Sequence, residues 1–137
     1  MENISGRERS FFKAAQAVSE LSDHRYKIGC VIVDKHRIIS SGSNSDTKCH
    51  AVQADLDTEY FNCFCTGKLH AEVRSIIPLL KYKMDLSRAT LYTYREFKNG
   101  RPALARPCPR CMKLIKQVGI RRIKYTTSDG YATEQIV

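Results

Sequence analysis

Two short motifs contain side chains that could bind a metal ion and move a proton. One is His-Ala-Glu at residues 70–72, and the other is Pro-Cys-Pro-Arg-Cys at residues 107–111. A two-residue gap lets the thiolates of Cys108 and Cys111 bind one ion, and a helix N-terminus would stabilise them as anions. With the neutral imidazole of His70 they make three protein ligands for Zn²⁺. The fourth tetrahedral position is then left for water, as in catalytic zinc sites.

Glu72 lies two residues after this histidine, close to the expected metal but not needed as a ligand. Its carboxylate could take a proton from the water at the fourth position and return it to a leaving amine. Neither motif is specific alone, since a single Cys-x-x-Cys is also typical of structural zinc and of redox pairs. Together, each at the start of an expected helix and separated by an expected strand, they predict a catalytic zinc centre.

Hydrophobic periodicity and turn residues predict the elements that position these motifs. In the first half of the chain, apolar spacing predicts an amphipathic helix over 10–22. Two β-branched runs at 28–33 and 38–42, joined by a short polar turn, predict a hairpin. Residues 45–69 show no sustained periodicity, and we expect a long loop there.

In the second half, strands and helices are expected to alternate, which predicts an α/β layered domain spanning 1–137. The first expected element is a helix that opens near His70 and kinks or ends at Pro78. A strand at 89–94 follows, and then a basic loop at 95–106 with a turn at Asn99-Gly100. The chain is then expected to form a helix from Pro109 to a stop at Gly119, a strand at 120–127 and a last strand at 131–137.

The positive charge of the chain is concentrated in one segment. The 137 residues carry a formal net charge of +9, and the segment 95–124 contains ten Lys or Arg residues and one acid, Glu96. The rest of the chain therefore sums to zero. Such an asymmetric distribution favours a polyanionic partner, such as nucleic acid, a nucleotide or an acidic membrane, although a solubilising basic face is the alternative.

Other features bear on location and on further metal sites. No run approaches the ~18 apolar residues of a membrane-spanning helix, and the N-terminus lacks the apolar core of a signal peptide. We therefore expect a cytoplasmic protein with reduced cysteines and no membrane partner. A second, structural zinc ion is a weaker hypothesis, and its candidate ligands are Cys49, His50, Cys63 and Cys65.

The two motifs make the sequence similar to the zinc-dependent cytidine deaminase superfamily, whose signature is H-x-E…P-C-x-x-C. The resemblance extends from the opening helix to the Cys-Pro-Arg-Cys helix. It implies a three-layer α/β/α fold, in which both zinc-site helices pack on one face of a mixed sheet of about five strands. It also implies hydrolytic deamination: water activated at zinc attacks C4 of cytosine or C6 of adenine, Glu72 moves protons, and ammonia leaves.

The C-terminal end of the sequence indicates which branch of this superfamily the chain resembles. Relatives that act on tRNA adenosine, and many that act on deoxycytidylate, add a helix and a parallel strand after the fourth strand. Only nine residues follow Ser128 here, and they begin with Asp-Gly, which favours a hairpin. An antiparallel last strand resembles the branch of free-cytidine deaminases and of polynucleotide cytosine deaminases related to bacterial toxins. Small phage deaminases of similar length also look like this chain.

The basic loop 95–106 favours single-stranded nucleic acid, with DNA preferred, because cations and an aromatic side chain can track phosphates and stack a base. Tyr92 and Tyr94 of the preceding strand could add to this stacking, although at least one of the two is expected to lie in the core. In the family, an asparagine after the second strand holds the ribose or base, and Asn44 matches it. The residues expected to contact substrate are Asn44, Ala71, Arg95, Phe97, Arg101, Arg106 and Arg110.

Two alternatives stay open. One is an enzyme that acts on free cytidine, deoxycytidine or their monophosphates, since a nucleotide phosphate needs only one or two cations. The other is a zinc-stabilised nucleic-acid-binding module without chemistry, against which the presence of Glu72 argues. Oligomeric state and sequence context are not predicted, and although DNA is the preferred expectation, no residue singled out here distinguishes DNA from RNA.

Overall fold

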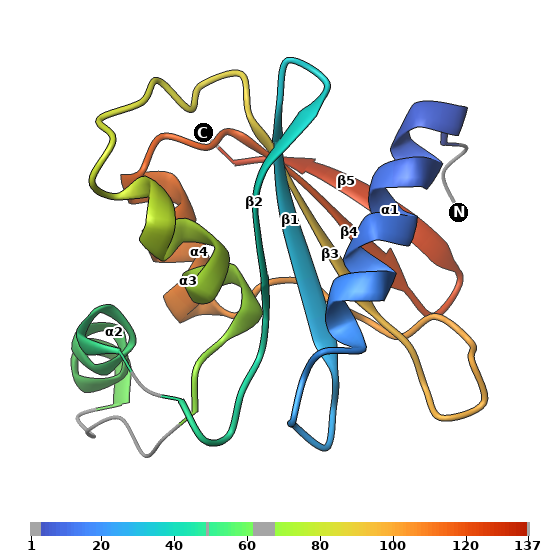
Figure 1. The fold of residues 1–137 in the computed structure, drawn as a ribbon, viewed down its shortest axis with the longest axis horizontal. Helices are drawn as coiled ribbons and strands as arrows, with labels where there is room; N and C mark the ends of the chain where they lie inside the picture. The colour runs from blue at the N-terminus through green and yellow to red at the C-terminus, as the bar shows by residue number, and fades with distance from the viewer. Residues whose placement is uncertain (1–3, 49, 62–67, 137) are drawn as a thin grey trace.

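A five-stranded mixed sheet forms the centre of the computed structural model, which describes residues 4–48, 50–61 and 68–136 (Figure 1). The strands lie in the order β2-β1-β3-β4-β5. The pair β3 and β4 is parallel, and the other neighbouring pairs of this sheet are antiparallel. The strand bounds are Ile28–Asp34 for β1, Arg37–Ser43 for β2, Thr90–Arg95 for β3, Arg122–Thr127 for β4 and Gly130–Gln135 for β5.

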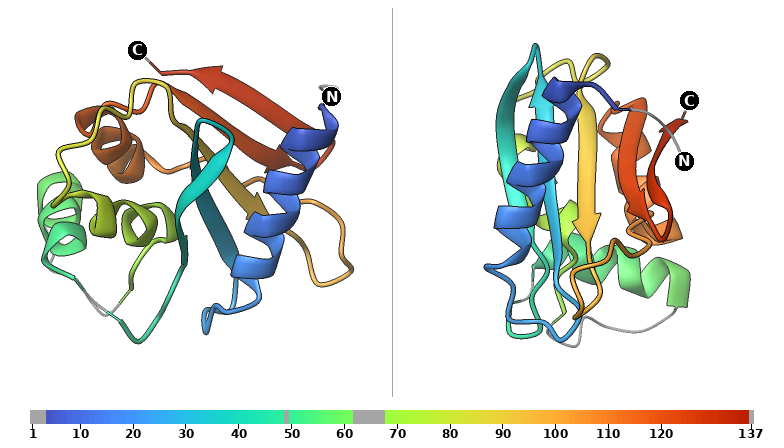
Figure 2. Two further views of the ribbon diagram at one scale, coloured as in Figure 1. Left: turned by 45° about the horizontal axis from the view of Figure 1, so that its top comes forward. Right: turned by 90° about the vertical axis from the view of Figure 1, so that its right-hand side faces the viewer.

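Helices cover both faces of the sheet, as Figure 2 shows. The helix α1 (Gly6–Ser19) packs on one face, while α2 (Ala51–Phe61), α3 (Ala71–Ile76) and α4 (Pro109–Gln117) lie on the other. This is the three-layer α/β/α arrangement that the sequence resemblance implies. Among the described residues, no helix combines the length and the apolar character that crossing a membrane requires.

Alternation along the central strands separates two hydrophobic cores. In β1, Cys30 and Ile32 face the core shared with α3 and α4, while Val31 and Val33 face the core beneath α1. Nearly every residue of β1 is buried because both faces are covered. The strand therefore holds the two helical layers in a fixed relation to each other.

Two glycines allow helices to approach the sheet closely. A Cβ at Gly29 would lie 2.0 Å from the carbonyl oxygen of Ala15 in α1. A Cβ at Gly42 would lie 2.8 Å from the backbone nitrogen of Ser75 and 3.0 Å from the carbonyl oxygen of Ala71, both in α3. Because backbone atoms cannot move aside cheaply, each glycine sets the depth at which a helix is seated.

Most expected elements of the second half are confirmed. After Ile76, the helix that follows His70 changes to a 3₁₀ turn, Ile77–Leu79, which contains Pro78. Gly119 follows α4 with a φ of +94°, as expected of a helix stop. The last strand, β5, is antiparallel to β4, as the short C-terminal end predicts.

The expected loop at 45–69 is wrong, because α2 lies within it. The buried residues of this helix include Gln53, which is fully buried, and Leu56. A polar side chain at a core position removes the apolar stripe from which an amphipathic helix is recognised. The opening helix spans 6–19 rather than 10–22. It begins after Ser5, whose hydroxyl accepts a hydrogen bond from the Glu8 N–H, and a polar first turn hides this start.

We expect Gly42→Ala to destabilise the fold by about 1–3 kcal/mol, because the added methyl group must push α3 away from β2. The same shift displaces His70 and Glu72, so zinc affinity should fall as well. Urea unfolding and zinc titration would measure both effects. The matched control is Gly6→Ala, since nothing lies within 4 Å of a Cβ at Gly6. A Gly42→Ala protein with unchanged stability and zinc affinity would contradict this account.

Candidate metal centre and active-site pocket

Three potential metal ligands converge where α3 and α4 begin. The Nδ1 atom of His70 lies 3.3 Å from the Cys111 sulfur and 3.6 Å from the Cys108 sulfur. The ligand atoms of all three residues lie within 4.8 Å of one another. Within the described ranges, this is the one group of three His, Cys or acidic side chains with metal-site spacing. The structure thus brings together the three residues that the sequence predicts as ligands.

Helix starts position two of these ligands. His70 is the N-cap of α3, and its carbonyl oxygen accepts a hydrogen bond from the Arg74 N–H. Cys108 is the N-cap of α4, where Pro109 at the first helical position preorganises the turn. Cys111 lies inside the first turn of α4 and is buried.

The cysteine pair is electrostatically prepared to bind a cation. A hydrogen bond from the Cys111 thiol, together with His70, lowers the pKa of Cys108 to about 3. The pKa of Cys111 is raised, because its thiol forms a hydrogen bond with Cys108 and is buried. One thiolate is therefore already favoured, and a bound cation would compensate the second.

Glu72 is buried beside this cluster, with 5% of its surface exposed. Burial raises the pKa of its carboxyl group, and the nearby His70 opposes that shift. A raised pKa makes the carboxylate a stronger base, which suits a group that must accept a proton and later release it. The Ser75 hydroxyl donates to the Glu72 carbonyl oxygen at 2.8 Å, which fixes this turn of α3.

The donor set fits zinc. One imidazole and two thiols are the nitrogen and sulfur ligands that Zn²⁺ prefers, and three protein ligands leave a position open. The open coordination position would face a pocket, because His70, Glu72 and Cys108 all line the same one.

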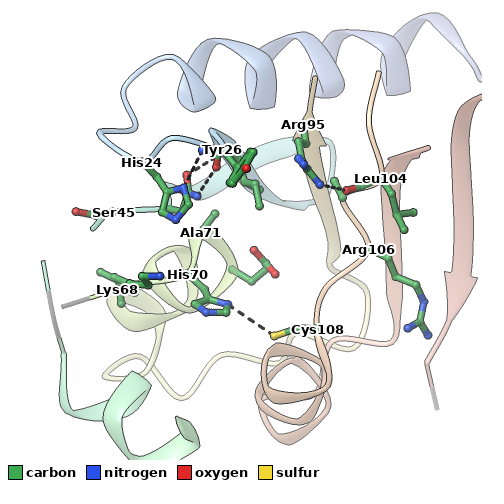
Figure 3. Close-up of a pocket in the computed structure, with 15 residues that line it drawn as sticks. His24, Tyr26, Ser45, Lys68, His70, Ala71, Arg95, Leu104, Arg106 and Cys108 are labelled. Carbon is green, nitrogen blue, oxygen red and sulfur yellow. Dashed lines mark hydrogen bonds between the residues drawn. The ribbon is translucent and has the colours of Figure 1, made fainter. Parts of the chain in front are cut away.

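This pocket has a volume of about 300 Å³, the lower end of the range for small-molecule sites. Figure 3 shows Tyr26 and Arg95 across the pocket from His70 and Cys108. Lys68 also lines it, beside His70. The metal cluster and the carboxyl group thus lie on one side, with an aromatic ring and a guanidinium group facing them.

Comparison with known families agrees with this geometry. The model of the cytidine and deoxycytidylate deaminase zinc-binding region matches residues 5–127. The chain belongs to this family. The ComE operon protein 2 of Bacillus subtilis is 25% identical over 133 residues, which cover 97% of this chain and 64% of that protein. The chain therefore spans less than two thirds of the length of this relative.

Solved structures show the same fold. The apo dCMP deaminase of cyanophage S-TIM5 gives a TM-score of 0.63 at 23% identity, over 89% of this chain and 84% of that one. The structure of this phage enzyme in complex with dCMP and dUMP gives 0.63 at 21% identity, over 90% and 83% of the chains. The cytidine deaminase of Burkholderia pseudomallei gives 0.64 at 13% identity, over 97% and 94%.

Asn44 lines the pocket and is buried, but its side chain is engaged within the protein. Its Oδ1 atom accepts hydrogen bonds from the Ser22 hydroxyl at 2.7 Å and the Ile28 N–H at 2.8 Å. Its Nδ2 atom donates to the Tyr26 carbonyl oxygen at 2.7 Å. Asn44 therefore ties the end of β2 to the 22–28 segment that carries Tyr26. Its contact with ribose or base stays a prediction.

The cations of the basic loop have different environments. Arg95 lines the pocket, with its guanidinium carbon 5.4 Å from the Tyr26 ring centroid and a hydrogen bond to the Leu104 carbonyl oxygen at 3.3 Å. Arg106 also lines the pocket, but its guanidinium group donates two hydrogen bonds to the Glu134 carboxylate, at 2.6 and 3.1 Å. Arg106 thereby anchors the end of the loop to β5.

Other expected substrate contacts do not line the pocket. Arg101 is exposed near the tip of the loop, and Phe97, half exposed, lines a neighbouring groove instead. Arg110 lies on α4, but it is not part of the pocket wall. Tyr92 and Tyr94 pack in the core beneath α1, so the suggestion that they stack a base at the zinc site is wrong.

The hypothesis of a second zinc site falls mostly on residues that the structure does not describe. Cys49, Cys63 and Cys65 lie outside the described residues. His50 is exposed just before α2, where its Nδ1 atom accepts a hydrogen bond from the Val52 N–H at 3.1 Å. The second site therefore stays a prediction.

Two contributors to the site escaped the sequence analysis. The Oε1 atom of the buried Gln53 accepts a hydrogen bond from the His70 N–H at 3.1 Å, so α2 positions a metal ligand. His24 lines the pocket, and its Nδ1 atom accepts from the Tyr26 N–H at 2.8 Å. No local signal identifies either residue, because each acts through a fold contact rather than through a motif.

The ion pair of Arg106 and Glu134 predicts a pH dependence of stability. Arg106 lowers the pKa of the Glu134 carboxyl group, so the pair stabilises the fold near pH 7 and this contribution is lost as the pH falls through that lowered pKa. Because both side chains are partly exposed, Glu134→Gln should cost only about 0.5 kcal/mol at pH 7. Urea unfolding of the two proteins should show the difference shrinking below about pH 4. A difference that persists at pH 2 would contradict this assignment.

Proposed function

We propose that this chain is a zinc-dependent hydrolase that converts the cytosine of a free nucleotide, such as deoxycytidylate, to uracil and ammonia. One observation carries the proposal: a single pocket combines the His70 and cysteine cluster, the buried Glu72 and the cations Lys68 and Arg95. The family membership supports the deaminase class. The cyanophage structure with dCMP and dUMP supports a nucleotide as the ligand.

His70, Cys108 and Cys111 would hold the metal. Zinc bound there supplies Lewis acidity, which lowers the pKa of a water molecule and makes it nucleophilic near neutral pH. The protein contributes the fixed positions of these ligands at the two helix starts and a partly enclosed pocket in which the cytosine ring can lie beside them.

Glu72 moves the protons. It accepts a proton from the water whose oxygen adds to C4 of cytosine and delivers that proton to N3. It then takes the proton of the new C4 hydroxyl group and passes it to the departing amine. The C4–N4 bond breaks, ammonia leaves, and C4 keeps the oxygen as the uracil carbonyl. The raised pKa of the Glu72 carboxyl suits both halves of this transfer. Ala71, buried in the pocket wall, leaves room for the base next to it.

The number of cations at the pocket favours a mononucleotide over a polymer. A single phosphate needs one or two cations, and Arg95 and Lys68 supply two. Arg106 is paired with Glu134, and Arg101 is not part of the pocket wall. Fewer cations are therefore available at the pocket than the sequence places near the zinc ligands.

Single-stranded nucleic acid is the second candidate, and a specific surface favours it. A groove next to the pocket shares Tyr26 and Arg95 with it and adds the half-exposed ring of Phe97. Arg25 and Lys98 also line this groove. Cations beside exposed rings are what the nucleotides flanking a target cytosine would require.

Glu72→Gln should retain about one zinc ion per chain and lose turnover by roughly 10²–10⁴-fold, because the amide keeps the shape but cannot carry the proton. Elemental analysis and a uracil assay on deoxycytidylate would measure the two quantities. Cys108→Ser is the comparison variant, which should lose zinc as well as activity. A Glu72→Gln enzyme with substantial turnover would refute the assigned role. So would a wild-type protein that binds zinc but deaminates no cytosine compound, and that result would support a binding module.

The substrate can be assigned with Arg95→Ala and its matched control Arg101→Ala. If the substrate is a free nucleotide, deoxycytidylate should react faster than cytidine, and Arg95→Ala should raise the KM for deoxycytidylate about tenfold or more. Arg101→Ala should leave that KM unchanged, since Arg101 does not line the pocket. Uracil formed only in cytosine-containing oligonucleotides, with both variants impaired, would favour the second candidate instead.

A further inference from the structure

We propose that a second site, far from the metal centre, binds a compact polyphosphate. A basic pocket with a volume of about 350 Å³ lies between α1 and the α1-side face of the sheet. Its cations come from four separate segments of the chain, and Glu8 is the one acidic residue among the described residues that line it. The cations are Arg7 in α1, Lys35 in the β1–β2 turn, Arg88 before β3, and Arg122 and Lys124 in β4.

The basic pocket is separate from the active-site pocket. Ile28 and Arg95 line the active-site pocket, whereas Val33 and Thr90 line the basic pocket, so the two sites lie at opposite ends of β1 and β3. Five residues of a strand span roughly 17 Å. In Figure 1, the β1–β2 turn and the start of α1 lie at the top, and the turn before β1 lies at the bottom.

Glu8 neutralises only a small part of the positive charge around the basic pocket. Glu8 forms an ion pair with Lys124 at 2.8 Å, so its charge is used by one partner. Arg88, Arg122 and Lys35 are exposed around the same cavity. Positive side chains brought together from distant segments repel one another, and an anion bound between them would relieve that repulsion.

The backbone fixes the rim of the basic pocket. Lys35 and His36 both have positive φ values, +51° and +66°, which define a tight two-residue hairpin turn. The Arg7 guanidinium lies 3.2 Å from the ring nitrogens of His36, joining this turn to α1. The rim therefore presents its cations from a preformed frame, which lowers the cost of ordering them around a ligand.

The shape and lining indicate the class of ligand. Phe11 and Tyr92 also line the basic pocket, with ring centroids 5.3 Å apart, and Tyr92 is buried against α1. Neither ring is free to stack a base on both faces, so recognition rests on the surrounding cations. A cavity of this size with cations on several sides suits two or three linked phosphates, either free or at the end of a nucleoside di- or triphosphate.

Isothermal titration of the full chain with inorganic tripolyphosphate at low salt tests the site. We expect one binding site per chain, and a loss of affinity of at least tenfold in Arg88→Ala/Arg122→Ala. The control is Arg121→Ala, which removes one positive charge next to Arg122 from a residue that does not line the basic pocket. Affinity in this control should stay within twofold. Lys35→Asn tests the β1–β2 turn independently and should also weaken binding. It removes a cation without straining the turn, because asparagine tolerates a positive φ.

Further titrations locate the ligand and separate its sources. Glu72→Gln should bind tripolyphosphate normally, and saturating deoxycytidylate should not compete, since the active-site pocket lies at the other end of the strands. ATP that binds as tightly as tripolyphosphate would indicate recognition of phosphates alone, and tighter binding of ATP would indicate a nucleotide. No binding by the wild type, an equal loss in Arg121→Ala, or competition by deoxycytidylate would overturn the proposal. Much tighter binding of a single-stranded oligonucleotide than of tripolyphosphate, lost in the double variant, would assign the surface to a nucleic-acid backbone and also overturn it.

Discussion

The close packing of α3 and α4 at their first residues is the constraint on which the site depends. Each helix has a metal-ligand candidate as its N-cap, so the ligand positions follow from where the two helices begin. Those beginnings are set by the sheet below them. Gly42 lets α3 sit directly on β2, and the buried Gln53 of α2 holds the backbone of His70 from the other side. The reactive groups are thus oriented by backbone packing and capping, with few side chains dedicated to the task.

The structure divides the basic segment into parts with different environments. Arg95 faces the active-site pocket, while Arg106 is tied to β5 through Glu134. Arg122 and Lys124 reach the other end of the sheet, where cations from outside the segment join them. A net charge that looks continuous along the sequence is therefore distributed over two ends of the molecule. Linear charge density is a poor guide to local potential when a segment passes through a helix and a strand.

The parts of the fold and site that could be predicted are those governed by local rules. Proline and glycine bracket α4, Asp-Gly begins the last hairpin, and the spacing of the two motifs places His70, Glu72, Cys108 and Cys111 together. What could not be predicted depends on contacts across the fold. Arg106 and Glu134 are 28 residues apart, and Asn44 bonds to a segment 16 to 22 residues earlier. The helix α2 was missed because a polar residue, Gln53, occupies a core position.

The parallel pairing of β3 with β4 has a consequence for cohesion. His70 precedes β3 and Cys108 follows it, 38 residues later, on the connection that must cross over to β4. An ion held by both residues would bridge the segments before and after β3, and because it binds the folded chain in preference to the unfolded one, it would stabilise the fold. The metal would then stabilise the fold as well as take part in the reaction. Loss of one ligand would loosen the crossover together with the chemistry, and the two effects would share a single cause.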